Sequence, residues 1–337
     1  MKTGILLINL GTPDAPTPGA VGRYLTEFLG DGRVIDIPYI PRKILVNGII
    51  SPTRRFKSSS EYKKVWTDEG SPLLLYSQEL RDKLALRFKD EDVDVELAMR
   101  YQKPSMDSVL AKMQKQNYDR IVILPLYAQY ASATTGSTLE KAFQIISKWY
   151  VIPEIVGISQ YWDHEGYLNA FVNRASGFDL DSYDHILFSY HGLPERQVDK
   201  VYEDRKCSNH SCESEINHEN KFCYKATCYA TTRAIAERLN IPDEKITVCF
   251  QSRLDSKWLR PFADEVVEER AEKGDKRLLV FSPAFVADCL ETLIEIGEEY
   301  DKDFQEMGGE KLDLVPSLNA EDDWVDALED ICRSRMR

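Results

Sequence analysis

The chain has 337 residues, of which 43% are hydrophobic and 29% charged, and its formal net charge is -13 at pH 7. At roughly 150 residues per domain, this length predicts two domains, each large enough for its own core. The acidic balance argues against nucleic-acid binding, which needs a basic surface. The chain shows no signal-peptide pattern at its start and no apolar run near the roughly 20 residues of a spanning helix, so we expect a cytoplasmic protein.

Short apolar runs alternate along the chain with longer amphipathic stretches. The runs predict strands at Ile5–Leu10, Val95–Met99, Ile121–Leu126, Ile186–Tyr190, Ile246–Phe250 and Leu278–Phe281. Helical periodicity falls between them, at Ala20–Leu29, Gln78–Phe88, Ser105–Gln116, Thr231–Leu239 and Leu259–Lys273. This alternation predicts an α/β fold of parallel sheets covered by helices on both faces. Residues at the carboxyl ends of the strands are therefore the first candidates for a functional site.

The alternating pattern occurs twice, which predicts two doubly wound parallel-sheet domains with a seam near residues 150–180. We assign residues 1–160 to an N-terminal α/β domain and 161–320 to a C-terminal α/β domain. A last helix occupies 321–337. No sequence repeat relates the two halves, so they are expected to share architecture alone.

Several runs that follow the predicted strands resemble motifs of the ferrochelatase family. They are Asn9–Pro13, Gly70–Leu73, Met99–Tyr101, Pro125–Tyr130, Thr134–Ser137, Ser189–Pro194, Gln251–Arg253 and Phe285–Leu293. They occur in the family's order over nearly the whole chain. The resemblance implies two Rossmann-like domains with a porphyrin cleft between them. It also implies an enzyme that inserts Fe²⁺ into protoporphyrin IX to form protohaem, the terminal step of haem biosynthesis.

Porphyrin metallation needs a group that accepts two pyrrole protons and groups that receive Fe²⁺ as it sheds water. His191, at the carboxyl end of a predicted strand, matches the family's active-site histidine. Neutral imidazole suits both proton transfer and metal contact, so either role stays open. Cys289 stands where many relatives have a histidine, so a second imidazole is not expected there.

A helix expected after Phe281 carries a set of acids. At about 100° per residue, they fall within an arc of about 80°. They are Asp288, Glu291, Glu295 and Glu299. A solvated helix face is the alternative. The resemblance implies that Glu291 is catalytic and that Asp288 orients it. Glu295 and Glu299 would then form a metal or proton path, and His191 and Glu291 are further candidates for contact with the metal.

Porphyrin contacts follow from position in the family motifs. Arg54 and Arg100 could pair with the propionates, because a guanidinium group matches a carboxylate. Ser71, Tyr101 and Trp258 are expected to line the macrocycle. For each aromatic side chain, ordinary core packing is the alternative.

Residues 34–50 are strongly apolar, are broken by prolines and have basic residues beside them. One interpretation is a buried helix. The other is a lip of the cleft that dips into a membrane, where each basic residue near anionic lipid adds roughly 1 kcal/mol. The second interpretation predicts weak peripheral attachment to the inner face of the membrane. Coproporphyrin enzymes of the family carry a tyrosine directly after Gly-Thr-Pro; here the position is Asp14, which favours protoporphyrin.

Four cysteines lie within 22 residues of a polar insert, residues 205–228. They are Cys207, Cys212, Cys223 and Cys228. In a reducing compartment such a group is better explained by metal than by disulfides. Zinc usually takes closer C-x2-C pairs, and some ferrochelatases carry a [2Fe-2S] cluster in an internal insert, so we expect [2Fe-2S] ahead of zinc. His210 and His218 are possible substitutes in a mixed site. Cys228 is the weakest ligand, since cluster-free relatives can share it.

Two other functions stay open. One is a coproporphyrin or other tetrapyrrole chelatase of the same fold. A chelatase that loads cobalt or nickel into a more carboxylated tetrapyrrole would want more histidines near the metal than this chain, with five in all, is expected to offer. The other is a non-catalytic iron–sulfur sensor on this scaffold, which could lose His191 or Glu291, and both are present. The sequence sets no oligomeric state.

Overall fold

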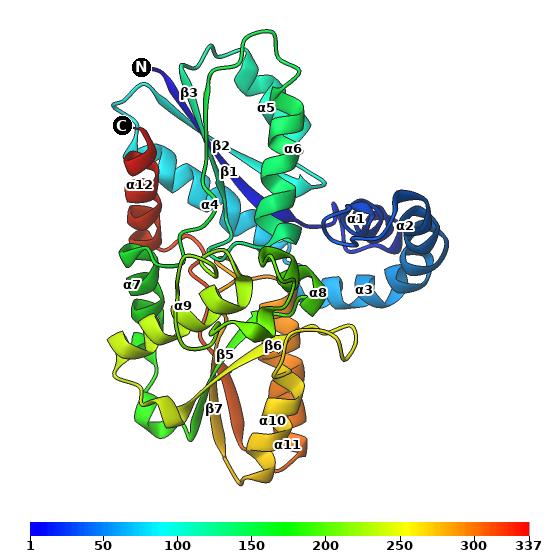
Figure 1. The fold of residues 1–337 in the computed structure, drawn as a ribbon, viewed down its shortest axis with the longest axis vertical. Helices are drawn as coiled ribbons and strands as arrows, with labels where there is room; N and C mark the ends of the chain where they lie inside the picture. Colours follow the sequence, from blue (N-terminus) through cyan, green and yellow to red (C-terminus); the bar gives the residue numbers. More distant parts are fainter. Residues whose placement is uncertain (337) are drawn as a thin grey trace. The chain divides into compact units, whose positions relative to one another are not determined.

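The computed structural model describes residues 1–336 and divides into two compact units (Figure 1). The first unit contains Met1–Tyr127, Ala131–Tyr161 and the chain from Asn319 onward. The second contains Ala128–Tyr130 and Trp162–Leu318. The C-terminal helix α12 (Asp322–Met336) thus belongs to the first unit, where Asp326 pairs with Arg87 of α4 (Pro72–Arg87) at 2.6 Å.

The first unit is built on a parallel sheet with the strand order β2-β1-β3-β4. The strands are β1 (Thr3–Gly11), β2 (Val93–Tyr101), β3 (Arg120–Pro125) and β4 (Glu154–Gly157). The other helices are α1 (Pro18–Gly30), α2 (Tyr39–Leu45), α3 (Ser51–Val65), α5 (Met106–Gln114) and α6 (Ser137–Ile146), with π-helical turns η1 (Val46–Ile50) and η2 (Ser132–Gly136). Helices cover both faces, which explains why the central strand β1 is buried along nearly its whole length and apolar from Ile5 to Ile8.

The second unit repeats this plan with the order β6-β5-β7-β8, again all parallel. The strands are β5 (His185–His191), β6 (Ile246–Gln251), β7 (Arg277–Phe281) and β8 (Lys311–Leu314). The longer helices are α7 (Glu165–Arg174), α9 (Tyr224–Leu239), α10 (Ala263–Glu272), η8 (Glu291–Tyr300) and α11 (Asp301–Glu306). Short helical turns are η3 (Ala175–Gly177), η4 (Leu180–Ser182), α8 (Glu195–Val198), η5 (Asp199–Val201), η6 (Cys207–Asn209) and η7 (Asp243–Lys245).

The predicted fold class is confirmed, because both units are parallel sheets flanked by helices. Each unit has its own core against its sheet. In the first, Leu6 and Ile8 of β1 are fully buried with Leu110 of α5. In the second, Leu187 of β5 is buried with residues of α10 and α11. Among residues 1–336, no helix combines the length and apolar character needed to cross a bilayer.

His185, at the start of β5, should make stability depend on pH. Burial lowers its pKa from 6.5 to about 4. As the pH falls below 6.5, the unfolded chain takes up a proton that the folded protein refuses until about pH 4, so stability is lost across this window. We expect a loss of at most about 3 kcal/mol.

Replacing His185 with glutamine should remove most of this pH dependence while keeping a polar group near Thr247, whose Oγ1 lies 2.8 Å from the imidazole Nε2. Urea unfolding of both proteins at about pH 7 and about pH 4.5 measures the difference. An equal loss of stability in the two proteins would show that other groups set the acid sensitivity.

Candidate active site

The strongest candidate site lies at the carboxyl edge of the second unit's sheet. His191 ends β5 and is paired in register with Gln251, which ends β6. The next residue, Gly192, donates its backbone N–H to the Gln251 carbonyl at 2.8 Å. A Cβ at this position would lie only 2.9 Å from the same oxygen, so the close approach of the two strands requires glycine. The sheet thus fixes the backbone that carries His191.

The His191 ring has a defined hydrogen-bond partner. Its Nδ1 lies 2.7 Å from the carbonyl oxygen of Gly192. A carbonyl oxygen can only accept, so Nδ1 carries the hydrogen, and Nε2 of the neutral ring is left as an acceptor. The rings of Trp258 and Phe285 each lie 6.4 Å from the imidazole, centroid to centroid. Trp258 is held there by a bridge to Pro194. The arrangement suits a proton acceptor beside a flat apolar ligand.

Glu295, on η8, is the most strongly held carboxylate of this site. It accepts hydrogen bonds from the Ser252 backbone N–H at 2.8 Å, the Ser252 hydroxyl at 2.5 Å and the Tyr300 hydroxyl at 3.1 Å. Burial raises its pKa, and the charge of Glu291 acts in the same direction, whereas the Ser252 bond and His191 oppose them. A carboxyl group with a raised pKa gains and loses a proton more readily near neutral pH. Glu295 is thus electrostatically linked to both His191 and Glu291.

The acidic helix differs from the expected one in type and in its start. Residues Glu291–Tyr300 form a π-helix, with i→i+5 bonding and a wider turn than the α-helix used to predict the acidic arc. Asp288 precedes this helix and is buried. Its Oδ1 accepts from the Ser317 backbone N–H and the Thr292 hydroxyl, both at 3.2 Å. The expectation that Asp288 shares the helical stripe was therefore wrong, because its carboxylate holds the chain before the helix.

The other acids of η8 differ in exposure. Glu291 is half-buried, and Glu299, near the end of the helix, is exposed. Cys289 is buried beside Glu291; burial, together with the Glu291 charge, raises the pKa of this thiol. Cys289 is therefore a neutral neighbour of Glu291. The structure brings His191, Trp258, Glu291 and Glu295 together and leaves Glu299 at the surface.

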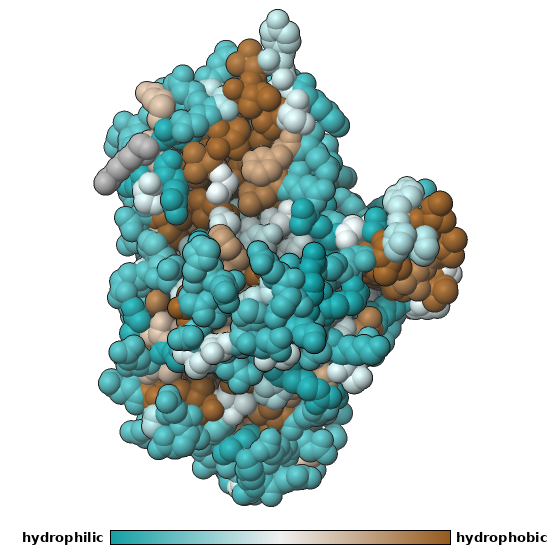
Figure 2. Space-filling model, viewed as in Figure 1, coloured by the Kyte–Doolittle hydropathy of each residue, from teal (hydrophilic) through white to brown (hydrophobic). Residues whose placement is uncertain are grey.

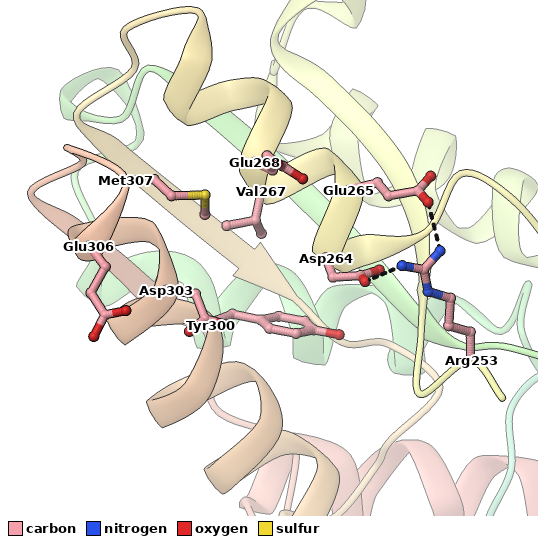
Figure 3. Close-up of a pocket in the computed structure, with 9 residues that line it drawn as sticks. All are labelled: Arg253, Asp264, Glu265, Val267, Glu268, Tyr300, Asp303, Glu306 and Met307. Carbon is pink, nitrogen blue, oxygen red and sulfur yellow. Dashed lines mark hydrogen bonds and ion pairs between the residues drawn. The ribbon is translucent and has the colours of Figure 1, made fainter. Parts of the chain in front are cut away.

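An acidic pocket of about 450 Å³ adjoins this helix (Figure 3). It is lined by Arg253, Asp264, Glu265, Val267, Glu268, Tyr300, Asp303, Glu306 and Met307. Arg253 pairs with Asp264 at 2.5 Å and with Glu265 at 2.6 Å. None of the predicted site residues lines this pocket. Its link to the site is Tyr300, whose hydroxyl binds Glu295.

In the first unit, Arg100 and Tyr101 are already paired with Asp31. The Arg100 guanidinium lies 2.6 Å from Asp31 Oδ2, and the Tyr101 hydroxyl donates to the same oxygen at 2.9 Å. Burial alone would raise the pKa of Asp31, but hydrogen bonds from Ser137 and the Arg33 backbone, with the Arg100 charge, lower it. Tyr101 is only 1% exposed. Their predicted contacts with porphyrin stay predictions, since here both side chains hold a buried carboxylate.

The remaining predicted porphyrin contacts of this unit have different surroundings. Ser71 is buried just before α4, and its oxygen accepts from the Thr12 hydroxyl at 2.9 Å. Arg54 lies exposed on α3. Neither geometry tests a role in porphyrin binding, so both stay predictions.

Three of the insert cysteines form a compact buried group. The Sγ atoms of Cys207, Cys212 and Cys223 lie 3.5, 3.8 and 3.9 Å apart. Hydrogen bonds from the thiols of Cys207 and Cys212 lower the pKa of Cys223 to about 3. The Tyr202 hydroxyl lies 2.8 Å from Cys212 Sγ, and the ring of His210 stacks on Tyr202 at 3.8 Å. The three-cysteine group thus brings three close soft donors together, as metal sites do.

Cys228 does not belong to the three-cysteine group. It lies five residues after Cys223 within α9, is fully buried, and its pKa is raised by that burial. His218 is exposed. The structure therefore brings together three of the four predicted thiol ligands. A four-coordinate metal at this group would take its fourth ligand from a residue other than these three.

Several residues of the site were not singled out from the sequence. Ser252 and Tyr300 bind Glu295, Asp31 holds Arg100, and Tyr202 contacts Cys212. Ser252 directly follows β6, so the rule of strand carboxyl ends could have found it. The other three face their partners through packing that single-sequence patterns do not encode.

Comparisons with known proteins agree over the whole chain. A family model described as "Ferrochelatase" matches residues 2–336. A ferrochelatase of Coxiella burnetii (strain Dugway 5J108-111) is 41% identical over 346 residues, covering 100% of this chain and 94% of its own. One of Legionella pneumophila (strain Lens) is 42% identical over 332 residues, covering 98% of each. The solved structure of SirB from Bacillus subtilis with Fe3+ has a TM-score of 0.58 at 12% identity, covering 99% and 95%, a likeness of fold.

Proposed function

Because this chain belongs to the ferrochelatase family and inserts ferrous iron into porphyrin in haem biosynthesis, we propose that it makes protohaem from protoporphyrin IX, and that His191, Glu291 and Glu295 carry the reaction. The observation that supports this assignment is the position of His191 at the end of β5, beside the end of β6, where the Ser252 backbone N–H holds the Glu295 carboxylate at 2.8 Å. Iron is the substrate here.

The reaction releases two pyrrole protons for each Fe²⁺ that enters the macrocycle. The hydrogen bond from His191 Nδ1 to the Gly192 carbonyl leaves Nε2 as the acceptor for a first proton. The Glu295 carboxylate, on which the His191 charge acts, would stabilise the imidazolium, and Glu291 and Glu295 would pass protons outward. A carboxylate stripe also offers oxygen ligands that replace water around incoming Fe²⁺. Trp258 and Phe285 would face the macrocycle.

The alternative of a non-catalytic iron–sulfur sensor is separated from an enzyme by turnover. With protoporphyrin IX and either Fe²⁺ without oxygen or Zn²⁺ in air, the purified protein should produce many equivalents of metalloporphyrin per chain. The visible spectrum follows the reaction. Formation at the rate of the protein-free mixture would reject the enzymatic assignment.

We further propose that the three-cysteine group holds a metal centre, and that this centre is a [2Fe-2S] cluster. The donor set fits a metal: three buried sulfurs are separated by 3.5 to 3.9 Å, close to the roughly 3.8 Å expected for sulfurs bound tetrahedrally at about 2.3 Å. The same spacing suits zinc. A fourth ligand is required in either case, and His210, which stacks on Tyr202 beside Cys212, is one candidate; Cys228 is the other. Iron insertion transfers no electrons, so the reaction does not call for a redox role of the bound centre. Its expected role is structural, as a cross-link within the insert.

The lip segment supports a proposed contact with a membrane. Several of its apolar side chains, together with Phe56 of the adjoining helix α3, are exposed rather than buried (Figure 2). They are Tyr39, Ile40, Ile44, Ile49 and Phe56, all at least 57% exposed. Basic residues lie beside them, including Arg42 and Lys43 in the last turn of α2. Apolar side chains next to basic ones are what an anionic lipid surface attracts. An apolar lip also suits protoporphyrin, which is less carboxylated than coproporphyrin.

Replacing Ile40, Ile44 and Ile49 with serine should weaken binding to vesicles of anionic lipid by at least about tenfold, since each buried isoleucine contributes roughly 1.5–3 kcal/mol. Co-sedimentation with vesicles measures the effect. Leu86→Ser is the matched control, because Leu86 is 65% exposed on α4, outside the lip. Absence of vesicle binding by the parent protein, or equal weakening by the control, would contradict the proposed membrane contact.

A further inference from the structure

Tyr224 joins the cysteine insert directly to the backbone of His191. It is the first residue of α9 and directly follows Cys223, the last of the three grouped cysteines. Its hydroxyl donates a hydrogen bond to the carbonyl oxygen of His191 at 3.0 Å. Tyr224 is 7% exposed, so water does not readily replace this bond.

On the His191 side, the hydrogen bond acts on a segment that is also held from β6. Gly192 N–H is bound to the Gln251 carbonyl at 2.8 Å, and the Gly192 carbonyl accepts from the His191 ring at 2.7 Å. The orientation of the imidazole therefore depends on the peptide groups at residues 191 and 192. Tyr224 fixes the first of these carbonyls from the side of α9.

On the insert side, a metal bound to Cys223 would fix the first turn of α9. The Cys223 backbone N–H donates to the Asn220 carbonyl at 2.8 Å, and its own carbonyl accepts from Thr227 N–H at 3.0 Å. Cys223 is bonded to Tyr224 and its carbonyl belongs to the first helical turn, so a displacement of Cys223 bears directly on the start of α9. The other end of the insert is anchored by Asp199, whose Oδ1 accepts from Cys207 N–H at 2.8 Å.

We propose that Tyr224 is a positioning residue through which the occupied three-cysteine group holds His191 in the orientation that accepts pyrrole protons. The inference rests on the proposed function, because it takes His191 as the proton acceptor and the three-cysteine group as a metal site. It assigns the insert a role, the regulation of iron insertion through one buried hydroxyl. Loss of the bound metal would loosen the start of α9, and with it the His191 carbonyl.

A double-mutant cycle of Tyr224→Phe and Cys207→Ser tests this coupling. Each single variant should lower kcat for Zn²⁺ insertion into protoporphyrin IX by about fivefold and leave KM for porphyrin within about twofold, since one net hydrogen bond is lost. The double variant should be no slower than the slower single variant, because both changes break the same link. The matched control is Tyr190→Phe, which removes another buried hydroxyl between β5 and α9, one that contacts Thr232 at 2.9 Å. The control should keep the full response to Cys207→Ser.

A second measurement reads His191 itself. In ¹⁵N-histidine NMR spectra of the full chain, the His191 ring signals, identified by their loss in His191→Ala, should shift in Tyr224→Phe and in Cys207→Ser. They should stay in place in Tyr190→Phe. If Cys207→Ser is too unstable for kinetic measurements, Cys212→Ser takes its place in the cycle and in the NMR comparison.

The possible results separate the inference from the function on which it rests. Multiplicative losses of about 25-fold in the double variant, or unchanged His191 signals in Tyr224→Phe, would overturn the role of Tyr224 while leaving enzyme and metal site intact. Wild-type protein with no metal at the three-cysteine group would overturn both the metal site and the coupling. Full activity of His191→Ala would instead reject the proposed proton acceptor.

Discussion

Replacing His191 with alanine, or Glu291 with glutamine, should lower the rate of iron insertion by about 10²–10⁴-fold, the usual contribution of a positioned acid or base. Alanine removes Nε2, the acceptor that the Nδ1 bond to Gly192 leaves available. Glutamine keeps the shape of Glu291 but removes the charge that acts on Glu295. Initial rates with protoporphyrin IX and Fe²⁺ under anaerobic conditions measure both effects.

Two controls make this result specific. Glu299→Gln removes an exposed carboxylate from the far end of the same helix and should change the rate by less than either site variant. Quenching of tryptophan fluorescence by porphyrin should show that His191→Ala and Glu291→Gln still bind the macrocycle. Turnover like that of the wild type in either variant would contradict the assigned site, and lost porphyrin binding would show that the variant acts on binding rather than on chemistry.

Serine in place of Cys207, Cys212 or Cys223 should abolish the metal centre of the insert. The wild-type protein purified without oxygen should be red-brown, with about two irons and two acid-labile sulfides per chain. Each of these thiols lies within 3.9 Å of the other two, so each loss removes one ligand of a compact site. Metal analysis and the visible spectrum measure the loss.

Cys228→Ser separates the two candidates for the fourth ligand. Cys228 is packed inside α9 and lies outside the three-cysteine group, so we expect this variant to keep its colour and His210→Ala to lose it. The reverse outcome would restore the four-cysteine site expected from the sequence. A colourless wild type with one zinc per chain would replace the cluster with zinc, and a colourless protein without metal would reject the site.

The fold was predictable because the central strands of both sheets are buried on two faces. Runs such as Ile5–Leu10 and Ile186–Tyr190 are apolar at nearly every position, which marks them without an alignment. The edge strands β4 and β8 were missed. They have four residues each and are partly exposed, so their sequences carry no distinct apolar run.

The site was predictable where the chemistry lies at a strand end and not where packing decides the partner. His191 is the last residue of β5, and the acids of η8 lie on the first helix after β7. The π-helical geometry of η8 and the position of Asp288 before it depend on contacts with Ser317 and Thr292. Spacing alone cannot distinguish a π-helix from an α-helix, because both place acids four residues apart on neighbouring turns.

The partners of Arg100 and of the insert cysteines were likewise not predictable from the sequence. Arg100 was expected to face a propionate, and the structure pairs it with Asp31, which is distant in sequence. The four clustered cysteines suggested four ligands, with Cys228 the weakest; in the structure α9 begins at Tyr224 and draws Cys228 into the core. A helix boundary, which sequence patterns place poorly, thus decides which thiols meet.

The most direct test is a competition between protoporphyrin IX and coproporphyrin III for limiting Fe²⁺ under anaerobic conditions, with the two haem products separated by chromatography. The proposed protohaem synthesis predicts that protohaem is formed at least about ten times faster than coprohaem, a difference of about 1.4 kcal/mol in transition-state stabilisation. Faster formation of coprohaem would contradict the assignment of protoporphyrin IX as the substrate.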